Sequence, residues 1–253
     1  MGAVVGFLAG LLGIGGGLIM VPALVYLFMH QLQLDLSFAM PMAIATSLST
    51  IMFTGFSASV AHYKLGNLNR FVLLYSGVGM ALGAIIGAQF ASVLPGELLK
   101  KIFAVLVIAI VTNMVFGKRS ESAQQVNKTN LSIIGLVTGS LSALMGIGGG
   151  AILVPALLWF RVNIKQAIGC AAFCGLIIAI FGSLSFVQAG WNHTDLPPLS
   201  FGYVYLPASV GIVSLSVFTA PWGARLGQSL DTLLLKKIFA GFLVIVSLRM
   251  LLG

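Results

Sequence analysis

The stretch that decides the fold is LLGIGGGLIMVPAL at residues 11–24, where four glycines occupy five positions of an otherwise apolar segment. The same pattern returns as LMGIGGGAILVPAL at residues 144–157. Consecutive glycines weaken a helix, and the proline in the following turn removes a backbone hydrogen bond. Each stretch therefore predicts a break in an apolar helix, made twice in the same way.

The rest of the chain is too apolar for a water-soluble globule. Of its 253 residues, 59% are hydrophobic and only 7% are charged, and the mean hydropathy is +1.10. A soluble domain carries about a quarter charged residues. The basic residues behind the net charge of +8 are scattered between apolar runs, as in membrane loops, and do not predict nucleic-acid binding. We expect an all-α, polytopic membrane protein.

Apolar runs long enough to span a bilayer, which takes about 20 residues, occur six times. They cover residues 37–61, 70–92, 98–117, 165–189, 201–222 and 234–252. Two further apolar runs, at 1–29 and 131–160, contain the glycine motifs.

Three sequence features recur in the same order in the two halves of the chain. Besides the glycine motif, GAQFASVL at 87–94 matches GARLGQSL at 223–230, and LKKIFA at 99–104 returns at 235–240. Duplicated units are common in secondary transporters. We therefore expect a first membrane repeat at 1–117, a linker at 118–130 and a second repeat at 131–253.

The loop charges indicate how the repeats are oriented, because Lys and Arg concentrate in cytoplasmic loops. If each glycine motif crossed the membrane once, the 13 basic residues would divide six against seven. If each motif is instead the tip of a hairpin, ten basic residues share one face: Lys64, Arg70, Lys118, Arg119, Lys128, Arg161, Lys165, Arg225, Lys236 and Lys237. Three remain opposite: Lys100, Lys101 and Arg249.

This bias favours hairpins. Each half then contains a glycine-tipped broken-helix hairpin and three transmembrane helices, and the two repeats are inverted. The linker at 118–130 is expected in the cytoplasm, and both termini on the opposite side. The hairpin arms could be re-entrant or fully spanning.

A helix that begins after a glycine break starts with amide groups that lack intrahelical partners. Such irregular backbone persists in a membrane only inside protein or beside water, and helix N-termini attract anions. The predicted binding residues are Gly13, Gly15, Gly16, Gly17, Leu18, Pro22, Gly146, Gly148, Gly149, Gly150, Ala151 and Pro155. The alternative is close helix packing, the role expected for Gly79, Gly83 and Gly87 at four-residue spacing.

The distribution of polar residues favours an anionic ligand. All five acidic residues fall in or beside predicted loops, so no carboxylate is expected in the membrane core. Thr46 and Ser47 are predicted to assist binding, although hydroxyls in such helices often bond to backbone instead. We recognise no nucleophile–base pair and no metal-ligand cluster, and expect neither an enzyme nor a cofactor.

The doubled GxGGGxxxVPxL motif, the repeated LKKIFA, LPPLSFGYVYLPA at 196–208 and APWGARLG at 220–227 resemble the TauE/SafE sulfite exporter family, also called the toluenesulfonate uptake permease family. The resemblance covers nearly the whole chain. It implies a prokaryotic inner-membrane permease for sulfite, sulfoacetate or other organosulfonates. The expected partners are the anion and the lipid bilayer, and a second copy of the chain in a homodimer is a further possibility.

Together these features predict a secondary transporter that binds a small sulfur-containing anion at the midplane, between broken-helix N-termini. A passive anion channel and a non-transporting membrane subunit are the alternatives.

Overall fold

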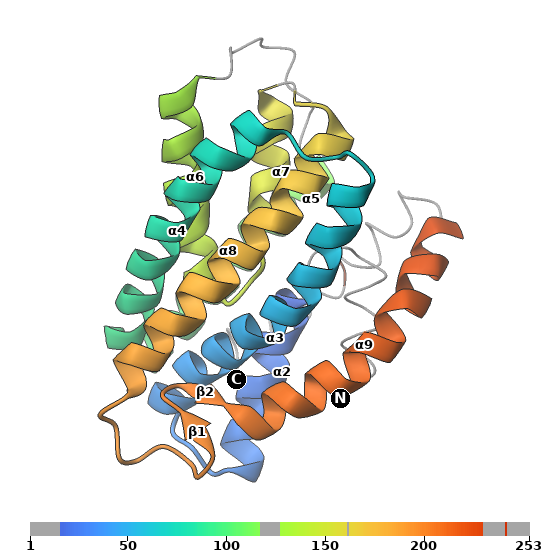
Figure 1. Cartoon of the computed structure of the whole chain (residues 1–253). Helices are drawn as coiled ribbons and strands as arrows, with labels where there is room; N and C mark the ends of the chain where they lie inside the picture. The colour runs from blue at the N-terminus through green and yellow to red at the C-terminus, as the bar shows by residue number, and fades with distance from the viewer. Residues whose placement is uncertain (1–15, 117–126, 161, 230–240, 242–253) are drawn as a thin grey trace.

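The computed structural model describes residues 16–116, 127–160 and 162–229, together with Gly241, as helices and one short strand pair (Figure 1). The helices and strands are α2 (Gly17–Gln31), α3 (Leu36–Lys64), α4 (Arg70–Val93), α5 (Gly96–Phe116), α6 (Lys128–Met145), α7 (Gly150–Trp159), α8 (Ile164–Gly190), β1 (Ser200–Phe201), β2 (Val204–Tyr205) and α9 (Leu206–Ser229). The first arm of the first predicted hairpin lies outside the described residues, as does the span predicted at 234–252 apart from Gly241.

Three of these helices are long and apolar enough to cross a membrane: Leu36–Lys64, Arg70–Val93 and Gln166–Gly190. An apolar stripe follows the outer face of α4, where Leu74, Val78, Leu82, Ile86 and Phe90 are each 54–59% exposed. Such a stripe is unfavourable in water but favourable against lipid chains. The helix content and the outward apolar stripe agree with the predicted helical membrane protein.

Helices α4 and α6 pack closely because glycines line their contact. A Cβ added at Gly79 or Gly83 would overlap the backbone of Ser132 or Leu136, respectively. A Cβ at Gly87 would overlap Ser140 in the same way, so the two helices run parallel. The packing role predicted for these three glycines is confirmed.

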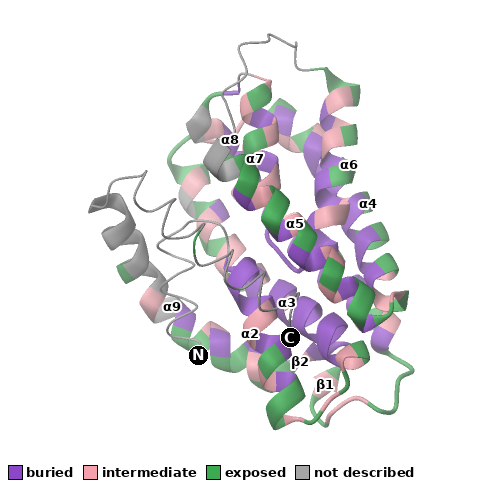
Figure 2. Cartoon of the chain, turned by 180° about the vertical axis from the view of Figure 1, so that it is seen from behind, coloured by how far each residue is buried: buried purple, intermediate pink, exposed green. Residues whose placement is uncertain are grey.

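Helices α3 and α8 cross the centre of the bundle in opposite directions. Gly55 on α3 lies against Leu176 on α8, whereas Leu48, earlier on α3, lies against Gly182, later on α8. Figure 2 shows buried residues where the helices face one another and exposed residues on their outer faces.

The sequence predicts a continuous apolar span at 201–222, and the structure corrects its start. Residues 200–205 form a two-stranded antiparallel hairpin, and α9 begins only at Leu206. Leu199 and Gly202 both adopt left-handed backbone conformations, with φ of 67° and 56°. These two residues turn the chain back on itself, which a continuous helix does not permit.

Candidate functional site

The two glycine motifs start helices at equivalent positions. Helix α2 begins at Gly17 and α7 at Gly150, the last glycine of each GIGGG. In both helices the proline, Pro22 or Pro155, is the sixth residue. The structure therefore starts helices where the sequence predicts broken-helix N-termini.

The second motif is a hairpin between α6 and α7. Gly146 ends α6 in the left-handed conformation with φ 67°, and its amide donates to carbonyls of the last turn. The start of α6 and the end of α7 line one surface pocket of about 230 Å³, formed by Asn130, Ile133, Ile134 and Phe160. Helix α7 therefore runs back alongside α6. Its 10 residues rise about 15 Å, roughly half the hydrocarbon core of a bilayer.

The two glycine motifs touch each other through their backbones. A Cβ added at Gly17 would overlap the carbonyl oxygen of Gly146 and lie 2.8 Å from the Cα of Ile147. Only glycine at position 17 permits this approach. Segments separated by more than a hundred residues thus meet at one point.

The α7 end of the site is open beside the backbone. The amides of Ile152 and Leu153 donate to the carbonyl of Gly149, whereas those of Gly150 and Ala151 have no acceptor among the described residues. Apart from its chain neighbours and the backbone of its own helix, no described atom lies within 4 Å of a Cβ added at Gly150. Space and free donors therefore coincide at the first turn of α7.

The α2 end differs because its first residue is already in contact with Gly146. Gly16, its N-cap, has φ 70°, whereas the equivalent Gly149 has φ −51°. The amides of Ile19 and Met20 both donate to the carbonyl of Gly16, at 3.0 Å. The two helix starts are therefore equivalent in sequence but not in geometry.

Thr46 and Ser47 are both fully buried on α3, and Ser47 contacts this junction. The hydroxyl of Ser47 donates to the carbonyl oxygen of Gly146 at 2.8 Å, and the hydroxyl of Thr46 accepts from the amide of Tyr205 at 3.0 Å. Both side chains thus bond to backbone far away in sequence, which is the alternative noted for such hydroxyls. A direct contact of either with a ligand stays a prediction.

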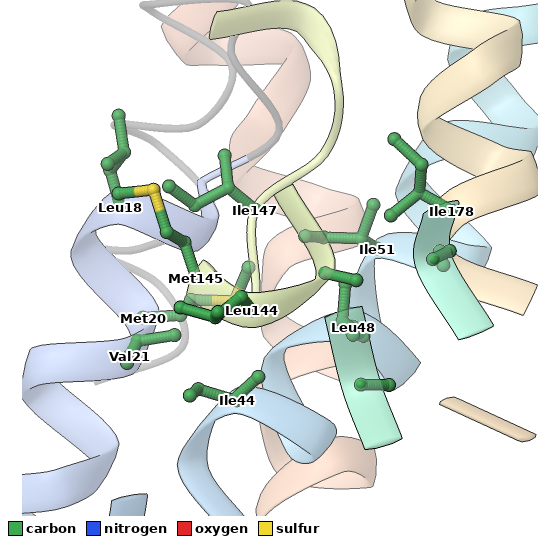
Figure 3. Close-up of a cluster of buried hydrophobic side chains, with 14 of the residues drawn as sticks. Leu18, Met20, Val21, Ile44, Leu48, Ile51, Leu144, Met145, Ile147 and Ile178 are labelled. Atoms are coloured by element: carbon green, nitrogen blue, oxygen red, sulfur yellow. The ribbon is translucent and has the colours of Figure 1, made fainter. Parts of the chain in front are cut away.

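The surroundings of the junction are apolar and free of buried charge. Figure 3 shows Leu18 of α2, Ile44, Leu48 and Ile51 of α3, and Ile147 gathered around it. In the described part of the chain, every buried polar side chain is a serine or a threonine. One of them, Ser142 in the last turn of α6, has a hydroxyl with no hydrogen-bond partner. Recognition at this place would depend on amides and hydroxyls.

The remaining predicted residues are placed as follows. Gly13 and Gly15 lie outside the described residues, and Leu18 is buried against the junction. A Cβ added at Gly148 would lie 3.4 Å from Cγ2 of Ile51, and Ala151 is half-buried in the first turn of α7.

Sequence reasoning missed Gly175 of α8, where an added Cβ would lie 3.4 Å from the amide nitrogen of Gly149. A lone glycine in an apolar helix carries no signal that could have revealed this contact.

Apolar outer faces, long helices and helices that start at glycine breaks define a class: multi-pass membrane proteins with discontinuous helices. The family profile described as sulfite exporter TauE/SafE matches residues 1–250. The chain belongs to this family, and the resemblance seen in the sequence is confirmed.

Named relatives are described as membrane transporters. A probable membrane transporter protein of Haemophilus influenzae is 41% identical over 254 residues, covering 100% of this chain and 96% of the relative. A probable membrane transporter protein of Methanocaldococcus jannaschii is 24% identical, covering 100% of this chain and 93% of the relative. The probable membrane transporter protein YunE of Bacillus subtilis is 25% identical, covering 99% and 95%. No solved structure matches the chain. The family and these relatives indicate a non-enzymatic membrane transporter.

Proposed function

We propose that this protein is a secondary transporter that moves a small sulfur-containing anion, such as sulfite or an organosulfonate, across a prokaryotic inner membrane. The anion binds near the midplane at the N-terminal ends of α2 and α7. The observation that carries the proposal is the open space beside Gly150, next to the unpartnered amides of Gly150 and Ala151.

The electrostatics of the junction support an anion over a cation. A helix N-terminus carries partial positive charge and free N–H donors. The described charged residues lie at helix ends and loops, so no buried carboxylate opposes a negative ligand. The printed family description, sulfite exporter, supports a sulfur oxyanion.

The free energy available from helix N-termini limits how tightly they alone can bind the anion. One partly buried N-terminus contributes up to about 2 kcal/mol, so two contribute about 4 kcal/mol. That free energy corresponds to a dissociation constant of about 1 mM. Tighter binding would need further donors, and the unpartnered hydroxyl of Ser142 is one candidate.

The proposed transporter consists of two inverted repeats, 1–117 and 131–253, joined by a cytoplasmic linker at 118–130, with both termini outside. Three features support this arrangement: α2 and α7 start at equivalent glycines, α3 and α8 run in opposite directions, and α7 folds back along α6.

The described basic residues support the same orientation. Asn67, in the loop between Lys64 and Arg70, packs on Gly169 near the start of α8. Lys100 and Lys101, by contrast, lie near the start of α5, where Gly96 packs on Leu36 at the opposite end of α3. We place the Lys64–Arg70 end in the cytoplasm because Lys and Arg concentrate there.

The site is tested by replacing Gly150 with Leu in the full-length protein. A Cβ at this position meets no described atom outside its own helix turn within 4 Å, so we expect the protein to fold while the larger side chain excludes the anion. Binding of sulfite, thiosulfate, sulfate and several sulfonates is followed by thermal shift in detergent. We expect the wild-type shift with at least one of these anions to disappear in Gly150→Leu.

Gly211→Leu is the matched control, because an added Cβ at Gly211 of α9 also has no described neighbour within 4 Å. It should retain the wild-type response. Anion binding that survives Gly150→Leu would place the site elsewhere. Gly16 is a poorer target, since its φ of 70° strains any side chain.

The transport mode is tested with purified protein in liposomes. A secondary transporter should show saturable uptake of labelled sulfite that unlabelled sulfite trapped inside accelerates. Flux that does not saturate and shows no such exchange would indicate a channel. Absence of any flux would indicate a non-transporting subunit.

A further inference from the structure

The carbonyl group of Gly146 joins three segments of the chain. Its oxygen accepts a hydrogen bond from the hydroxyl of Ser47 on α3 and lies against the backbone of Gly17 at the start of α2. Gly146 itself ends α6. One peptide group of the second half is thus held by two elements of the first half.

The other end of the same peptide group is also fixed. The amide of Ile147 donates to the carbonyl of Ser142 at 2.9 Å, within the last turn of α6. With both its carbonyl and its amide bonded, the Gly146–Ile147 peptide cannot rotate without breaking a hydrogen bond. The three glycines that lead into α7 follow immediately.

We infer that Ser47 is a positioning residue: through its hydrogen bond to Gly146, it holds the α6–α7 turn so that the first amides of α7 keep the geometry for anion binding. The role of those amides rests on the function proposed above. Ser47 does not touch the ligand in this assignment. It acts through the backbone of the other half of the chain.

The chemistry of the contact supports this role over a local one. Thr50, one turn further along α3, bonds to the Ser47 carbonyl in its own helix and to the sulfur of Met20. Ser49 bonds to the Thr46 carbonyl in the same way. Of these hydroxyls on α3, that of Ser47 reaches the turn, across 99 residues of sequence. Without it, the buried carbonyl of Gly146 would lose its donor.

Two readouts test the assignment on full-length protein in detergent. The first is hydrogen–deuterium exchange of the amides of residues 147–153, which needs no ligand. The second is the dissociation constant for sulfite, with sulfate as a comparison anion. Ser47→Ala should accelerate exchange in this segment and weaken anion binding, each by about tenfold, the effect of one lost hydrogen bond.

Ser59→Ala is the matched control because it removes a buried hydroxyl of the same helix that bonds only to the Gly55 carbonyl of α3 and does not contact the turn. It should leave both readouts near wild type. Ser47→Cys keeps a weak donor of similar size and should give intermediate values. This second variant also keeps the test informative if the alanine variant folds poorly.

The outcomes separate this assignment from the proposed function. Unchanged exchange in Ser47→Ala would overturn the positioning role. Weaker binding with unchanged exchange would make Ser47 a direct ligand, and faster exchange with unchanged binding would make it purely structural, so either result contradicts the inference. If wild-type protein binds neither sulfite nor sulfate, the proposed function fails, and the exchange data alone decide whether Ser47 holds the turn.

Discussion

Glycines with the same backbone conformation have different structural roles in this protein, depending on how closely neighbouring atoms pack against them. Gly66 and Gly146 have nearly the same backbone conformation, with φ of 68° and 67°. A Cβ at Gly66 has no described neighbour within 4 Å, whereas one at Gly146 would lie 2.8 Å from Val21 Cγ2 and 3.0 Å from Ile44 Cα. A substitution at Gly66 therefore reports backbone strain alone, whereas the same substitution at Gly146 reports strain together with a steric clash.

We expect Gly66→Ala to cost about 1–2 kcal/mol, the strain of a left-handed residue with a Cβ. Gly146→Ala adds a steric clash with the backbone of α3 and should cost more. Thermal unfolding in detergent measures both, and each kcal/mol corresponds to roughly 2–4 °C for a chain of this size. Equal shifts in the two variants would show that Gly146 is not tightly packed.

At this scale the sequence predicts much of the candidate site and misses its contacts. The run of glycines and the proline five positions after its last member suffice to place the starts of α2 and α7. Nothing in the residue pattern reveals that Gly17 meets Gly146, or that Ser47 bonds there. These are long-range contacts that depend on how the two halves pack. They produce no recognisable residue pattern in the sequence of either segment.

Among the helices, the α4–α6 pair shows what small residues permit. A Cβ at Gly83 would overlap the carbonyl of Leu136 and lie 2.9 Å from the amide nitrogen of Ser140. The α6 backbone cannot rotate away from an added methyl group, whereas the end of a flexible side chain can. A Cβ at Gly77 would meet only the Cδ1 end of Ile177, at 3.1 Å.

Gly83→Ala should therefore force α4 and α6 apart and lower the folded yield, whereas Gly77→Ala should be nearly neutral. Size-exclusion chromatography and thermal unfolding of the two purified variants make the comparison. A folded, stable Gly83→Ala protein would contradict the close α4–α6 crossing.

The short strand pair depends on Thr46 for one of its anchors. Thr46→Val removes the acceptor for the amide of Tyr205 while keeping the shape of the side chain. We expect a loss of about 1 kcal/mol and faster proteolysis around residues 199–205. Thr138→Val, whose hydroxyl bonds only within α6, is the control. Equal proteolysis in the two variants would show that Thr46 does not anchor the strands.

The sequence could not predict this strand pair because its composition is that of the neighbouring span. Phe201, Tyr203, Val204 and Tyr205 are as apolar as a membrane helix, and hydropathy alone joins them to α9. Hydrogen bonding separates them: the amide of Tyr203 donates to the carbonyl of Phe186, and that of Tyr205 to Thr46.

The whole molecule has two ends, and the loop charges predict which one faces the cytoplasm. Leu65, beside Lys64, and Trp191, after α8, lie on exposed connections at opposite ends, with 70% and 62% of their surfaces accessible. Leu65→Cys should react with a membrane-impermeant maleimide only after the cell membrane is permeabilised, and Trp191→Cys in intact spheroplasts.

Wild-type protein sets the background because both native cysteines, Cys170 and Cys174, are buried. The reverse labelling pattern would invert the proposed orientation. A cysteine placed at residues 30–36 that labels from the same side as Leu65→Cys would contradict the crossing of the membrane by α3, on which the proposed topology depends.

The backbone contact between Gly17 and Gly146 also restricts the path of any solute through the protein. The gap there is too narrow for a methyl group, and both walls are main chain, which cannot swing aside like a side chain. An oxyanion is larger than a methyl group and cannot pass between these residues. In this conformation, a permeation route through the junction must therefore pass beside the contact between Gly17 and Gly146.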